Sequence, residues 1–175
     1  EQDLKRVEAR GGLCDEGNGP SWLTLLGVPW DGSVGWRPGA AGAPGRLRKI
    51  SHTSPAISED GFALDPARHR VRDLGDVGPQ VEEGVVRYFD RVEKTAQSVL
   101  CAAERPFLFS IGGDHSVLIP LFRGFAAARP GTLGLVLLDA HPDLFDEYDG
   151  SRPSHACPIR RPFGTGRLGP EHLLV

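Results

Sequence analysis

Four short runs of apolar residues mark the chain, and glycine, proline or charged residues follow each of them. The runs occupy residues 22–28, 70–77, 107–111 and 133–140. Uninterrupted apolar runs of this length are typical of strands that are buried on both faces of a parallel sheet. The run at 70–77 is the weakest of the four because charged residues interrupt it. The pattern therefore predicts a sheet of parallel strands.

Segments with helical spacing separate these runs. Apolar residues recur at helical intervals between Val81 and Glu104, and Pro106 lies just beyond that segment. Pro44 is placed to open a short helix through Lys49. Residues 116–128 predict a further helix, which Pro120 can kink. Strands that alternate with helices indicate an α/β fold with a parallel sheet.

The two ends of the chain depart from this pattern. Residues 1–20 are polar and Gly-rich, and we expect them to form an arm beside one domain that occupies residues 21–175. Residues 160–172 look like a loop, and the final LLV resembles the start of another strand. The chain contains no methionine, even at its first position. We therefore expect a piece of a longer product, with a fold that is incomplete at its C-terminus.

Composition narrows the functional classes. Hydrophobic residues make up 39% and charged residues 25% of the chain, as in ordinary soluble globular proteins. The net charge of −3 does not favour binding to nucleic acid or to acidic membranes. No apolar run approaches the roughly 20 residues of a membrane span. The N-terminus lacks a secretory signal, and the three cysteines are too scattered for a disulfide framework, so we expect a cytoplasmic protein.

The stretch DAHPD carries three potential metal ligands at the end of an apolar run. Side chains alternate along a strand, so Asp139, His141 and Asp143 can share one face, and Pro142 places them at or beyond the strand end. Two carboxylates and an imidazole disfavour one another unless a cation compensates. This donor set suits Mn²⁺, with Mg²⁺, Fe²⁺ or Co²⁺ as alternatives. A strand end with solvated acids and a capping histidine is the simpler interpretation.

The stretch GGDHS, at residues 112–116, also follows an apolar run. It is predicted to form a glycine turn between a strand and a helix. His115 lies at the carboxyl end of its predicted strand, beside Asp139 if the two strands pair. A single histidine in such a place is often a hydrogen-bonded structural residue, but the nearby DAHPD favours a ligand. Asp114 or Ser116 can instead cap the following helix.

A third histidine follows in SHACPIRR, at residues 154–161. His155 could shuttle protons, since imidazole titrates near neutrality, or it could be an exposed loop residue. The sequence leaves both interpretations open. Cys157 is expected to be a packing residue. The acidic segment 145–150 is expected to be a solvated loop, or else part of a rim that attracts a cationic substrate.

Together these motifs resemble the signatures of the ureohydrolase family of arginases and agmatinases, and they come closest to its agmatinase-like branch. The matching segments follow the family's order: GVPWDGSVGWRPGAAGAPGRLR at 27–48, RDLGDV at 72–77, GGDHS at 112–116, DAHPD at 139–143 and SHACP at 154–158. The resemblance implies a three-layer α/β/α fold with a mainly parallel sheet.

The resemblance also implies a site with two manganese ions. His115, Asp139 and Asp143 would bind one ion, His141 would bind the other, and Asp139 would bridge both. His155 aligns with the histidine that is assigned as the proton shuttle. In such enzymes a hydroxide held by the ions attacks the guanidinium carbon, and urea is released.

One family motif, a later strand end that supplies two more aspartate ligands, is missing because the chain ends at Val175. Two Mn²⁺ ions carry more positive charge than Asp139, Asp143 and a hydroxide can balance. We therefore expect these residues alone to bind metal weakly and not to turn over substrate. We also expect unpaired sheet edges that promote association.

The resemblance implies a small guanidino substrate and, commonly, a homo-oligomer that is a trimer or a hexamer. Hydrolysis of agmatine to putrescine, a step of polyamine metabolism, is favoured, and arginine to ornithine comes next. Two other interpretations stay open. The chain could be a noncatalytic remnant that acts only by association. It could also be another binuclear metallohydrolase, such as a deacetylase-like one, although GGDHS and SHACP would then need a separate explanation.

Overall fold

The structure, a computed structural model, describes all residues except 1–21, 52, 54–56, 58, 62–69 and 104–105. The polar arm expected at residues 1–20 lies outside the described residues, so that division of the chain stays a prediction.

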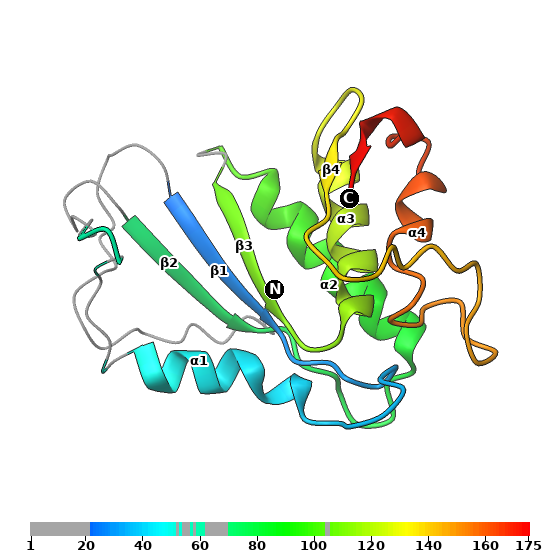
Figure 1. The fold of residues 1–175 in the computed structure, drawn as a ribbon. Helices are drawn as coiled ribbons and strands as arrows, with labels where there is room; N and C mark the ends of the chain where they lie inside the picture. Colours follow the sequence, from blue (N-terminus) through cyan, green and yellow to red (C-terminus); the bar gives the residue numbers. More distant parts are fainter. Residues whose placement is uncertain (1–21, 52, 54–56, 58, 62–69, 104–105) are drawn as a thin grey trace.

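The main sheet contains three parallel strands in the order β2-β1-β3 (Figure 1). The strands are β1 (Trp22–Val28), β2 (Arg70–Asp76) and β3 (Phe107–Gly112). In the central strand, Leu23 is in register with Val71 of β2 and Phe107 of β3. The positions of the first three predicted strands and their parallel arrangement are confirmed.

Helices cover both faces of this sheet. Leu26 and Val28 of β1 pack into a core with residues of α2 (Val85–Leu100) and of the segment that leads into α3 (Leu118–Ala128). Gly27 faces the opposite way, toward Pro44 of α1 (Ala43–Ser51). Figure 1 shows the sheet between α1 on one side and the α2–α3 pair on the other. The fold is therefore three-layered, as the family resemblance implied.

Two helices differ from the sequence-based expectation. Helix α2 begins at Val85 rather than at Val81, because Glu82 has a positive φ of 60° and Gly84 is extended. Helix α3 runs without a break from Leu118, because Pro120 lies in its first turn, where its missing N–H removes no helical hydrogen bond.

The last part of the chain forms a second, two-stranded sheet. Strand β4 (Leu135–Val136) pairs in parallel with β5 (Leu173–Leu174), so the predicted final strand is confirmed. Residues 160–172, expected to be a loop, contain the short helices α4 (Arg160–Phe163) and η3 (Pro170–His172). Figure 1 shows this sheet apart from β3.

The apolar runs predict strands that are buried on both faces, and this prediction is wrong for β3 and β4. In β3, Phe107 and Phe109 are 68% and 49% exposed. Strand β4 covers only two residues of the predicted run at 133–140, and Leu138 beyond it is 95% exposed. Both strands are edge strands within the described residues, which contain no element covering these side chains.

Tyr88 anchors the main core. Its ring lies 5.1 Å from that of Trp30, and its hydroxyl donates a 2.8 Å hydrogen bond to the carbonyl of Val77. Burial raises the pKa of this hydroxyl above its usual range. None of the described helices has the length and apolar character needed to cross a bilayer.

Helices α2 and α3 approach each other closely at Gly124. A Cβ added there would lie 2.6 Å from the carbonyl oxygen of Glu93 and 2.8 Å from the Cβ of Ala96. The contact on one side is backbone, so a side-chain rotation cannot relieve it. Gly124 therefore permits the close crossing of α2 and α3.

We expect Gly124→Ala to lower the free energy of unfolding by about 1–3 kcal/mol through overpacking. The matched control is Gly45→Ala in α1, where a Cβ would meet nothing within 4 Å. That change should be neutral, or stabilise by up to about 1 kcal/mol through helix propensity. Urea titrations followed by circular dichroism measure both. Equal effects of the two substitutions would contradict the packing of α2 on α3.

Candidate metal centre

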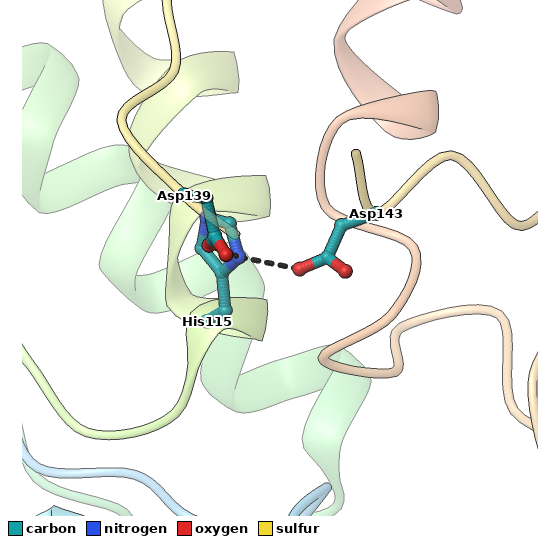
Figure 2. Close-up of side chains that lie close together, drawn as sticks. All are labelled: His115, Asp139 and Asp143. Atoms are coloured by element: carbon teal, nitrogen blue, oxygen red, sulfur yellow. Dashed lines mark hydrogen bonds and ion pairs between the residues drawn. The ribbon is translucent and has the colours of Figure 1, made fainter. Parts of the chain in front are cut away.

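Three side chains from distant parts of the chain converge beyond the carboxyl end of β3. His115 begins the short helix η2 (His115–Val117), and Asp139 and Asp143 follow β4. The Nδ1 atom of His115 lies 2.7 Å from Oδ2 of Asp143 and 3.3 Å from Oδ2 of Asp139 (Figure 2). One ligand atom from each residue can be chosen so that all lie within 4.8 Å of one another.

The chemistry of this group fits a divalent cation. It offers one imidazole nitrogen and two carboxylates, the mixture expected for Mn²⁺ or a similar ion. The Nδ1 atom of His115 carries at most one hydrogen, so it can donate to only one carboxylate at a time. The side chains of Asp139 and Asp143 are 29% and 15% exposed, so water screens their charges partially. A cation bound between them would remove their repulsion.

His141 lies outside this group, and the expectation that Asp139, His141 and Asp143 alternate along one strand face is wrong. Strand β4 ends at Val136, the backbone bends at residues 139–141, and Asp143 has a positive φ of 43°. The side chain of His141 is 79% exposed.

His141 nevertheless stays beside the carboxylate of Asp139. Its Nδ1 lies 3.8 Å from Oδ1 of Asp139, and its backbone N–H donates to the same oxygen at 3.0 Å. The two oxygens of Asp139 therefore face different histidines, with Oδ2 toward His115 and Oδ1 toward His141.

The turn that carries His115 is fixed by Asp114. One carboxylate oxygen of Asp114 accepts hydrogen bonds from the backbone N–H and the hydroxyl of Ser116. The other accepts from the backbone N–H and the hydroxyl of Ser33, at 3.0 and 2.8 Å. Asp114 is 7% exposed, and it caps the following helix, as the sequence suggested for Asp114 or Ser116. No sequence pattern singled out Ser33.

His155 is half-buried rather than a free loop residue. Its Nδ1 is hydrogen-bonded to the backbone carbonyl of Ser33, and the hydroxyl of Ser154 lies 3.4 Å from the same nitrogen. The ring of Tyr148 meets the imidazole edge-on at 5.6 Å. His155 is thus connected through Ser33 to the turn that carries His115.

The loop between Asp143 and α4 is held by ion pairs on its outer side. Asp146 contacts Arg152 at 3.0 Å and Arg161 at 2.5 Å, and the hydrogen bond from Arg161 holds the pKa of this carboxyl below its usual range. Cys157 is fully buried, and burial raises the pKa of its thiol, which confirms its expected packing role.

Comparison with known proteins adds independent findings. A model described as the arginase family matches residues 22–175. A guanidinopropionase of Pseudomonas aeruginosa is 37% identical over 83% of this chain and 45% of its own length. An agmatinase of Bacillus anthracis is 32% identical over 87% of this chain and 50% of its own.

Solved structures agree with the sequence comparisons. The arginase from Medicago truncatula superposes with a TM-score of 0.71 at 29% identity, over 87% of this chain and 49% of that one. The chain therefore spans about half the length of the relatives it matches.

We expect Asp143→Asn to weaken Mn²⁺ binding about tenfold or more, because it removes a charged ligand next to His115. Isothermal titration of the metal-stripped chain with Mn²⁺ measures the change. Asp149→Asn is the matched control, since Asp149 lies on the same loop and also has a positive φ, which asparagine tolerates. Equal affinities in the two variants would rule Asp143 out as a ligand.

Proposed function

Because the chain belongs to the arginase family, we propose that its protein is a manganese-dependent ureohydrolase that releases urea from a small guanidino compound. The observation that supports this most is the convergence of His115, Asp139 and Asp143 from two separate sheets. The position of the Asp139 carboxylate also supports the proposal, since its two oxygens face different histidines, His115 and His141.

Each residue has a defined task in this proposal. His115 and Asp143 would hold one ion, His141 would hold the second, and Asp139 would contribute to both. When bound, the ions supply Lewis acidity and lower the pKa of water. His155 accepts or donates a proton at Nε2, because its Nδ1 is engaged with the Ser33 carbonyl.

The relatives support a class of substrate, the small guanidino compounds. Agmatine carries a second cation and guanidinopropionate carries a carboxylate, so the two demand opposite charges at the far end of the site. We favour agmatine, with arginine next, because the DAHPD and SHACP motifs come closest to the agmatinase-like branch. We further propose a cytoplasmic homo-oligomer, a trimer or a hexamer, without nucleic-acid or membrane partners.

A second candidate function is association without catalysis. It is supported by the exposed apolar side chains at the edges of the two sheets, among them Phe107, Phe109, Val136 and Leu138. An edge strand with apolar side chains is a template for pairing with another chain. Under this alternative the 175 residues bind a partner but form no urea.

Urea release with Mn²⁺ supplied distinguishes the two functions. We expect no turnover by the 175-residue chain, and turnover by a longer product whose continuation adds two aspartate ligands. Agmatine, arginine and guanidinopropionate are compared as substrates. Rapid turnover by the 175 residues alone would contradict the need for further ligands.

Metal analysis of the same longer product tests His141. We expect His141→Asn to reduce bound manganese from two ions to one per chain, because its imidazole is the ligand assigned only to the second ion. His172→Asn is the control, since that histidine pairs with Glu171, whereas His141 lies beside Asp139. An unchanged manganese content in His141→Asn would refute the assignment.

A further inference from the structure

We infer that Ser33 is a positioning residue, which fixes the ring of His155 through its backbone carbonyl and ties that carbonyl to the turn carrying His115. The inference deepens the proposed function, because it rests on His155 as the proton-transfer residue. In the neutral imidazole of His155, either Nδ1 or Nε2 carries the hydrogen, and the contact with Ser33 determines which.

The partner of Nδ1 decides this tautomer. A carbonyl oxygen can only accept, so the hydrogen bond to Ser33 requires a hydrogen on Nδ1 of His155. In the neutral ring Nε2 then keeps a free lone pair and can take up a proton. The neutral histidine side chain in water prefers the other tautomer, with its hydrogen on Nε2. The contact with Ser33 therefore imposes a state that the free side chain disfavours.

Gly35 flanks the opposite edge of the ring. A Cβ added at Gly35 would lie 3.5 Å from Cε1 and 3.8 Å from Nε2 of His155, so the absence of a side chain there leaves space beside the accepting nitrogen. Tyr148 supports the ring edge-on. The ring is thus held at Nδ1 and by Tyr148, while its Nε2 edge is not crowded by residue 35.

The side chain of Ser33 fixes the carbonyl in turn. Its hydroxyl and its backbone N–H both donate to Oδ2 of Asp114, and the other oxygen of Asp114 is bound to Ser116. Asp114 precedes His115 directly in the chain. One buried carboxylate therefore sets the position of the metal-holding imidazole and, through Ser33, of the proton-transferring one.

Ser154 is the competing holder of the ring. Its hydroxyl lies 3.4 Å from Nδ1 of His155, a distance at which a hydrogen bond is weak. If Ser154 held the ring, its removal would change the tautomer and the removal of the Ser33 hydroxyl would not. The two serines therefore provide a matched pair of alanine substitutions.

The test is the tautomer of His155 in the ¹⁵N-labelled 175-residue chain, without metal and at a pH where the ring is neutral. Long-range ¹H–¹⁵N correlation spectra report the hydrogen on each ring nitrogen, and His155→Asn assigns the signals. We expect the Nδ1–H form in the wild type. Ser33→Ala should lower the ratio of Nδ1–H to Nε2–H roughly fivefold, the equivalent of one ordinary hydrogen bond. Ser33→Thr, which keeps a hydroxyl, should restore it, and Ser154→Ala should leave it unchanged.

An Nε2–H form in the wild type would overturn the inference, even if no variant folds. An unchanged ratio in a folded Ser33→Ala chain, or a larger change in Ser154→Ala, would overturn it as well. Because the spectra need neither metal nor substrate, a failure to release urea leaves this result intact. The positioning role and the proposed activity can thus fail separately.

Discussion

The backbone of the glycine turn after β3 packs directly on the backbone of Trp30, and the candidate site depends on this contact. A Cβ at Gly113 would lie 1.7 Å from the carbonyl oxygen of Trp30, and that oxygen accepts a 2.7 Å hydrogen bond from the N–H of Asp114. Only glycine permits so close an approach. It joins the loop after β1 to the turn after β3, so that Ser33 can reach Asp114, while the indole of Trp30 rests on Tyr88 in the core.

The other half of the site is placed by apolar packing rather than by strand pairing. Strands β3 and β4 belong to separate sheets within the described part of the chain. Helix α3, which follows His115, packs its Phe122 and Ala126 against Leu133 in the segment leading to Asp139. The distance between His115 and the two aspartates therefore depends on the packing of α3 against the segment before Asp139. A cation between them would join the two sheets directly and stabilise the arrangement.

The sequence predicts those parts of the fold and site that follow from local pattern. Buried runs and turn residues locate the strands. The rule that ligand sites form at carboxyl strand ends correctly places His115 near Asp139, but the expected pairing of their two strands is not found in the described residues. The pattern fails where local backbone conformation overrides it. Alternation along a strand cannot place His141, because the chain bends before Pro142 and Asp143 takes a positive φ. The sequence does not reveal the role of Ser33 for another reason. Ser33 acts through its backbone carbonyl, which every residue has, on a histidine 122 positions away.

Hydrogen bonding separates the carboxylates that can bind metal from the one that cannot. Asp114 is adjacent to His115, but both of its oxygens are occupied by donors from Ser33 and Ser116. A cation there would have to displace these donors from a buried carboxylate, which is costly. Asp139 and Asp143 instead face the imidazole of His115 and stay partly open to solvent. The same short motif thus supplies a structural carboxylate and an imidazole of the candidate metal site, and the distinction comes from the loop after β1 rather than from the motif itself.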